Sequence, residues 1–110
     1  VIVGHSFGGA VAISAAARDR RIAAVVGLSN QTAGAQPVGR IAPRPLLLVH
    51  GLDDDRLPPS LSRTIYAWAG EPKGLVLLAG ARHSLRQRRE DLRAILIRWL
   101  TEALRAPRQP

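Results

Sequence analysis

The residues best suited to chemistry occur near the start of the chain, where Gly4-His5-Ser6-Phe7-Gly8 matches the pattern G-x-S-x-G. A β-branched run precedes this motif and a run of small residues follows it, so we predict a strand, a tight turn and a helix. Such a sharp turn leaves no room for side chains at Gly4 and Gly8 and exposes the hydroxyl of Ser6, our candidate nucleophile. A glycine-rich turn can also bind phosphate, but neither G-x-x-x-x-G-K-[ST] nor G-x-G-x-x-G is present.

A serine hydroxyl needs a base to remove its proton, and that base needs a carboxylate to fix its tautomer. His83 follows the fourth apolar run and the acidic triplet Asp53-Asp54-Asp55 follows the third. Both would therefore lie with Ser6 at the carboxyl edge of a parallel sheet. Of the other two histidines, we expect His5 to pack or hydrogen bond beside the serine turn, and His50 to support the acidic loop from a strand end.

The segments that would position these residues alternate between apolar runs and helix-like patterns. We predict strands at residues 1–3, 22–28, 46–49 and 75–78, and helices at 10–17, 58–70 and from Glu90 to a stop at Pro107 and Pro110. Because the strands are continuously apolar, we expect a parallel sheet with helices on both faces, which is the α/β class. Residues 30–45 form a connection long enough for one short helical turn, and loops of that length are often functional.

Composition excludes several classes of protein. Hydrophobic residues make up 46% of the chain and charged residues 22%, which is typical of a soluble globular domain and excludes a disordered tail, a collagen or a membrane bundle. Because cysteine is absent, disulfides, cysteine metal sites and a thiol nucleophile are excluded. We predict no metal ion and no other cofactor. With no signal peptide and no membrane span in the sequence, we expect a cytoplasmic location and no membrane partner.

The net charge of +8 comes from 16 basic and 8 acidic residues, and every basic residue except Lys73 is arginine. We interpret this charge as arginine usage on the outer faces of helices, and expect no nucleic-acid partner. The alternative is a non-catalytic or nucleic-acid-binding module that uses Arg86, Arg89 and Arg93 of the arginine-rich last helix. Such a surface would also need interleaved aromatic residues, and most of the aromatic side chains are expected in the core: Phe7, Tyr66, Trp68 and Trp99.

Three segments together resemble the α/β-hydrolase superfamily, near its dienelactone-hydrolase-like and serine-aminopeptidase-like branches: residues 4–9 (GHSFGG), 50–58 (HGLDDDRLP) and 80–83 (GARH). The order serine, acid, histidine is also the order found in this superfamily. Its acid loop commonly runs H-G-x-x-D-x-x-V-P, which places the acid at Asp54, with Leu57 where valine is usual. Asp53 and Asp55 are the alternatives, and otherwise serve loop solubility. Dienelactone hydrolases proper use cysteine, and dehalogenases and epoxide hydrolases use aspartate, so Ser6 argues against those reactions.

The resemblance implies the C-terminal part of an α/β-hydrolase fold, with a mostly parallel sheet of about four strands flanked by helices. We expect residues 1–110 to form a single partial domain that lacks the upstream strands and the loop supplying a second oxyanion donor. The chain alone would then be a poor enzyme, with an exposed, aggregation-prone edge at its first strand.

The function implied by the resemblance is hydrolysis of small ester or other acyl substrates by a serine hydrolase. In that mechanism His83 takes the proton of Ser6, Asp54 orients the imidazole, and the backbone N–H of Phe7 supplies one oxyanion-hole donor. Water then cleaves the acyl-enzyme. Arg82, beside His83, is the basic residue we would test for a role with acidic substrates.

Overall fold

The sheet of this protein has four parallel strands, and the computed structural model describes residues 1–105. The strands lie in the order of the sequence: β1 (Ile2–His5), β2 (Val25–Leu28), β3 (Leu46–Gly51) and β4 (Lys73–Leu78). Every neighbouring pair is parallel, as the apolar runs predicted. β3 is buried at all six residues, because β2 and β4 flank it in the sheet and helices cover both of its faces.

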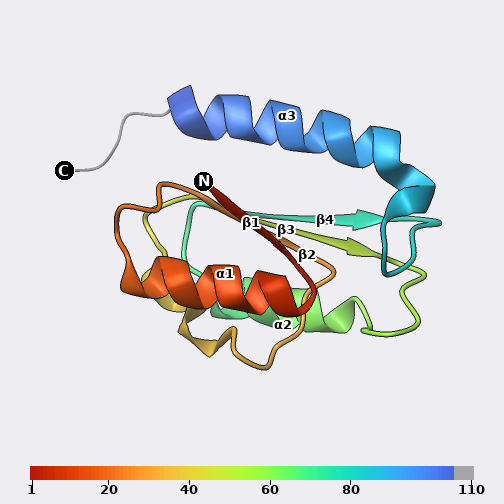
Figure 1. The fold of residues 1–110 in the computed structure, drawn as a ribbon, viewed down its shortest axis with the longest axis horizontal. Helices are drawn as coiled ribbons and strands as arrows, with labels where there is room; N and C mark the ends of the chain where they lie inside the picture. Colours follow the sequence, from red (N-terminus) through yellow and green to blue (C-terminus); the bar gives the residue numbers. More distant parts are fainter. Residues whose placement is uncertain (106–110) are drawn as a thin grey trace.

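Helices cover both faces of the sheet, as Figure 1 shows. Helices α1 (Phe7–Arg18) and α2 (Ser60–Trp68) lie on one face, and α3 (Arg89–Arg105) lies on the other. Alternate residues of β2 and β3 point to the two faces, so Val25 belongs to one apolar cluster and Val26 to the other. This arrangement is the α/β class expected from the sequence.

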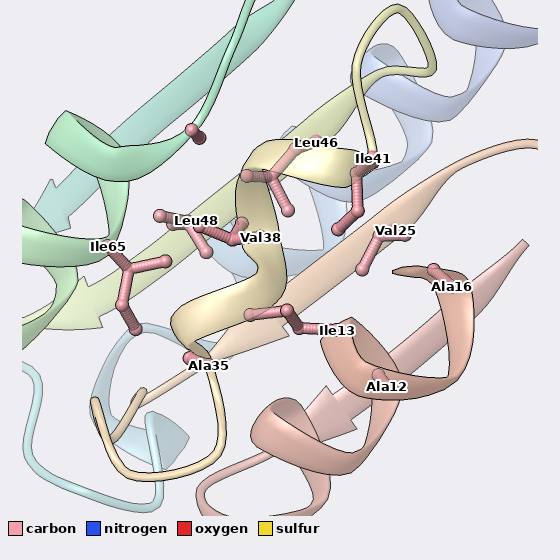
Figure 2. Packing of buried hydrophobic residues seen from close by; sticks show 11 residues of the cluster. Ala12, Ile13, Ala16, Val25, Ala35, Val38, Ile41, Leu46, Leu48 and Ile65 are labelled. Carbon is pink, nitrogen blue, oxygen red and sulfur yellow. The ribbon is translucent and has the colours of Figure 1, made fainter. Parts of the chain in front are cut away.

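The apolar cluster under α1 and α2 is the larger one, and Figure 2 shows its packing. Residues 30–45 contribute Ala35, Val38 and Ile41 to it, all fully buried, and the short 3-10 helix η1 (Gln36–Arg40) holds them there. The predicted short helical turn is thus confirmed. The length of this connection is explained by packing, because it covers the sheet between α1 and α2.

Several element bounds differ from the prediction. β2 begins at Val25 instead of residue 22, because the guanidinium of Arg44 holds the carbonyls of Asp19 and Ile22 in the preceding turn. A 3-10 turn, η2 (Arg86–Arg88), leads into α3, which starts one residue before Glu90. The predicted stop at Pro107 and Pro110 lies outside the described residues.

The expectation that most of the aromatic residues are core residues is wrong, because two of the four are exposed. Phe7 is 70% exposed and Trp68 is 43% exposed, because they occupy the first position of α1 and the last position of α2. Tyr66 and Trp99 are partly buried, each against a different apolar cluster. Within residues 1–105, no helix combines the length and the apolar character needed to cross a membrane.

Candidate active site

The strand register brings the carboxyl ends of β1, β2 and β3 side by side. His5 pairs with Leu28, and Leu28 pairs with Val49. The next residue along each strand, Ser6, Ser29 or His50, therefore lies at the same edge of the sheet. Loops that follow parallel strands gather at this edge, where ligands of open α/β sheets usually bind.

Ser6 occupies a one-residue turn between β1 and α1, as the G-x-S-x-G motif predicts. Its φ of 57° and ψ of −118° are an unusual conformation for a residue with a side chain, and such strain is common at functional sites. A Cβ atom on Gly4 would overlap the backbone of Gly8, which explains the first glycine of the motif. The same explanation is wrong for Gly8, because a Cβ there meets nothing within 4 Å.

The structure brings Ser6, His83 and Asp54 together from three loops. The Nε2 atom of His83 lies 3.1 Å from the Ser6 hydroxyl oxygen, and its Nδ1 atom lies 2.8 Å from Oδ2 of Asp54. A carboxylate can only accept, so Nδ1 of His83 carries the proton, and Nε2 of the neutral ring accepts from the Ser6 hydroxyl. Asp54 is buried, whereas the alternative acids Asp53 and Asp55 are exposed to solvent.

The carboxylate of Asp54 is held in its charged form by hydrogen bonds. Burial opposes its ionisation, but the Leu57 N–H, the imidazole of His83 and the Arg56 N–H together lower the pKa of Asp54 below its usual value. Both backbone donors reach Oδ1 at 2.9 Å, which leaves Oδ2 facing His83. The acid is therefore charged at neutral pH and aimed at the imidazole.

Two side-chain donors hold the backbone carbonyl of His83. Its carbonyl oxygen accepts from the Ser29 hydroxyl at 2.7 Å and from Nε2 of His5 at 2.8 Å. The rings of His5 and His83 also lie 5.0 Å apart, centroid to centroid. The prediction that His5 hydrogen bonds beside the serine turn is thus confirmed. Ser29 was not among the residues predicted from the sequence, although a polar residue directly after a buried strand indicates a position at this edge.

Other residues singled out in the sequence take these places. The Phe7 N–H is the first of α1, and in the described part of the chain it donates to no other group, so it is free to serve a ligand. Arg82 is exposed beside His83, and a role for it stays a prediction.

Two arginines near the last helix form ion pairs. In α3, Arg98 pairs with Glu102 at 3.8 Å, and Arg88, just before α3, pairs with Asp91 at 2.6 Å.

Known structures with a similar fold include esterases and hydrolases. The esterase domain of a Rhodothermus marinus protein has a TM-score of 0.80 and 22% identity, covering 88% of this chain and 57% of that one. The alpha/beta hydrolase GrgF from Penicillium sp. sh18 has a TM-score of 0.74 and 19% identity, covering 90% and 61%. This chain has part of the α/β-hydrolase fold. Est1E from Butyrivibrio proteoclasticus also has this fold, with a TM-score of 0.82 and 20% identity, covering 94% and 61%.

Comparison by sequence gives a shorter match. A segment of 56 residues is 36% identical to the uncharacterized protein YfhR of Escherichia coli strain K12, covering 51% of this chain and 20% of YfhR. No protein-family model matches the chain. The chain thus spans about three fifths of the Rhodothermus marinus and Penicillium structures, and its matched segment spans a fifth of YfhR. Sequence identities near 20% to solved structures establish the fold alone, so the activity is argued from the geometry of the site.

Proposed function

We propose that this chain carries the catalytic serine, histidine and aspartate of a serine hydrolase that acts on ester or other acyl substrates. The observation that carries the proposal is the continuous contact from Ser6 through His83 to Asp54, at 3.1 and 2.8 Å. These distances are within hydrogen-bond reach for a nucleophile, its base and an orienting acid. The site lies at the sheet edge where the α/β-hydrolase fold predicts it.

In the proposed reaction, His83 accepts the proton of Ser6 as the serine oxygen attacks the acyl carbonyl. The resulting imidazolium is stabilised by the charged carboxylate of Asp54, which also fixes the tautomer. The Phe7 N–H donates to the oxyanion, and the positive end of α1 adds to that stabilisation. His83 then gives its proton to the leaving group as the acyl-enzyme forms. A water molecule, deprotonated by His83, attacks the acyl carbon, and His83 returns that proton to the Ser6 oxygen as the acid product leaves.

A fluorophosphonate probe tests the proposal, because phosphonylation requires an activated serine but no full turnover. We expect the probe to label the wild-type chain, and Ser6→Ala to abolish labelling. Ser60→Ala is the matched control, since Ser60 is an exposed serine at the start of α2 and should leave the labelling rate unchanged. Labelling that survives Ser6→Ala would show that another residue is the nucleophile.

A further inference from the structure

A second serine–histidine pair lies on the other side of the Asp54 carboxylate. The hydroxyl oxygen of Ser62, on α2, is 2.6 Å from Nδ1 of His50, at the end of β3. Nε2 of His50 is in turn 3.2 Å from Oδ2 of Asp54, the same oxygen that accepts from His83. One carboxylate oxygen therefore lies between two imidazole rings, each of which contacts a serine.

The second pair is closed to substrate. Ser62 and His50 are both fully buried, and the Ser62 hydroxyl oxygen also accepts from Nδ2 of Asn30 at 2.9 Å. Ser6, by contrast, is partly exposed in its turn. The buried pair can therefore affect a reaction at Ser6 only through the groups it contacts, and of these groups Asp54 is the one that contacts His83.

Each hydrogen bond in the buried pair fixes the next one. The Leu57 carbonyl lies 2.8 Å from Nε2 of His50 and can only accept, so Nε2 carries the proton. Nδ1 of the neutral ring then accepts from the Ser62 hydroxyl. Asn30 completes the chain, because its amide N–H groups donate to both Ser62 and the Gly27 carbonyl. Rotating that amide would place its oxygen against the Gly27 carbonyl, which also can only accept, and lose that bond.

We propose that His50, held in its Nε2-protonated form by the Leu57 carbonyl and by Ser62, is a positioning residue for the Asp54 carboxylate. Its Nε2–H donates to the Leu57 carbonyl, and Nε2 lies 3.2 Å from Oδ2 of Asp54, so the ring ties the acid loop to β3 and places its N–H dipole against the oxygen that serves His83. This inference rests on the proposed function for its effect on catalysis. The buried tautomer and its effect on the carboxylate stand independently of turnover.

The charges around Asp54 predict the direction in which the titration of His83 should move when His50 is replaced. Asp54 is the titratable side chain in contact with His50, and its neighbours Asn30 and Ser62 are uncharged. On the far side, His83 contacts the same carboxylate and His5 contacts His83, while Asp53, Asp55 and Arg56 are exposed. Without the N–H dipole of His50 beside it, the charge of Asp54 is less compensated, so Asp54 and His83 together should hold their shared proton to higher pH. A purely structural loss would loosen that contact and shift the titration the opposite way.

The test is ¹⁵N-histidine spectroscopy of the full chain across pH, and the sequence has only three histidines to assign. In the wild type we expect the His50 ring to be protonated at Nε2 and bare at Nδ1. In His50→Leu we expect the titration midpoint of the His83 ring to rise by about half a pH unit or more. His50→Gln, whose amide N–H lies near the position of Nε2, should restore the wild-type midpoint.

Ser62→Ala provides a milder variant if His50→Leu does not fold. It removes the hydroxyl that donates to Nδ1, so we expect the ¹⁵N resonance of Nδ1 to shift while Nε2, which faces the Leu57 carbonyl, keeps its proton. A His50 ring protonated at Nδ1 in the wild type would overturn the inference, as would a His83 midpoint that is unchanged or lower in folded His50→Leu. The ring spectra need no catalysis, so failure of the probe to label Ser6 would count against the proposed function alone.

Discussion

At the scale of single residues, the site depends on keeping one buried carboxylate charged. The carboxylate of Asp54 accepts from the N–H groups of Arg56 and Leu57 and from the imidazole of His83, and His50 lies beside it. A buried charge is costly unless such donors compensate it, and here they outweigh the cost, since the pKa of Asp54 is lowered. The same groups that would orient His83 therefore also contribute to stability.

This lowered pKa of Asp54 predicts a pH dependence of folding. A carboxyl group whose pKa is lower in the folded state contributes stability above its unfolded pKa of about 3.8, and that contribution is lost as pH falls through the folded value. Asp54→Asn removes this contribution. We expect urea unfolding to show the largest deficit of Asp54→Asn relative to wild type above about pH 4, and a shrinking deficit below it. A deficit that grows toward low pH would contradict this assignment of charge.

At the scale of elements, the two motif glycines of the turn between β1 and α1 have different surroundings. Gly4 faces the backbone of Gly8 across the turn, whereas Gly8 belongs to α1 and has open space where a Cβ would project. The residue after it, Gly9, is close to the side-chain oxygen of Asn30, so the tight approach between α1 and the segment that follows β2 occurs one position later than the motif suggests.

These differences predict unequal effects of alanine at the two glycines. We expect Gly4→Ala to destabilise the fold by about 2–3 kcal/mol, because the new methyl group overlaps backbone. Gly8→Ala should be neutral or stabilising by about 0.5–1 kcal/mol, since alanine is favoured over glycine in a helix. Urea denaturation of the two variants measures both effects. Equal destabilisation at both positions would mean that the turn is packed differently.

The sequence predicted elements better than it predicted the contacts between them. Continuously apolar runs are enough to infer parallel strands, and parallel strands place Ser6, Asp54 and His83 at one edge. Ser29, Asn30 and Ser62 were missed because their partners lie up to 54 residues away along the chain. Whether space next to Gly8 or Phe7 is occupied likewise depends on distant segments, which local patterns do not reveal.

At the scale of the whole molecule, the two faces of the sheet are covered unequally. The face under α1 and α2 holds the larger cluster, with many fully buried side chains. α3 covers the other face, and none of its residues is fully buried. Its apolar residues Leu92, Ile95, Leu96 and Trp99 are only partly buried against the sheet. The site loops connect to both layers, since His83 lies between β4 and α3.

This asymmetry predicts that α3 opens before the central strands. Local opening requires less free energy where few apolar side chains are buried, so the amides of α3 should exchange with solvent at a lower free energy than those of β2 and β3. Native-state hydrogen exchange at low denaturant concentration measures this order. Equal protection of α3 and β3 would show that the molecule unfolds as one unit instead.

The central claim is that the hydroxyl of Ser6 is the activated nucleophile. Its most direct test is to locate the phosphonate adduct by peptide mass spectrometry after brief exposure of the wild-type chain to the fluorophosphonate probe. The account predicts one adduct, on Ser6, with labelling that slows by about four orders of magnitude in Asp54→Asn, where His83 is held in the wrong tautomer. An adduct on any other residue, or a labelling rate unaffected by Asp54→Asn, would contradict it.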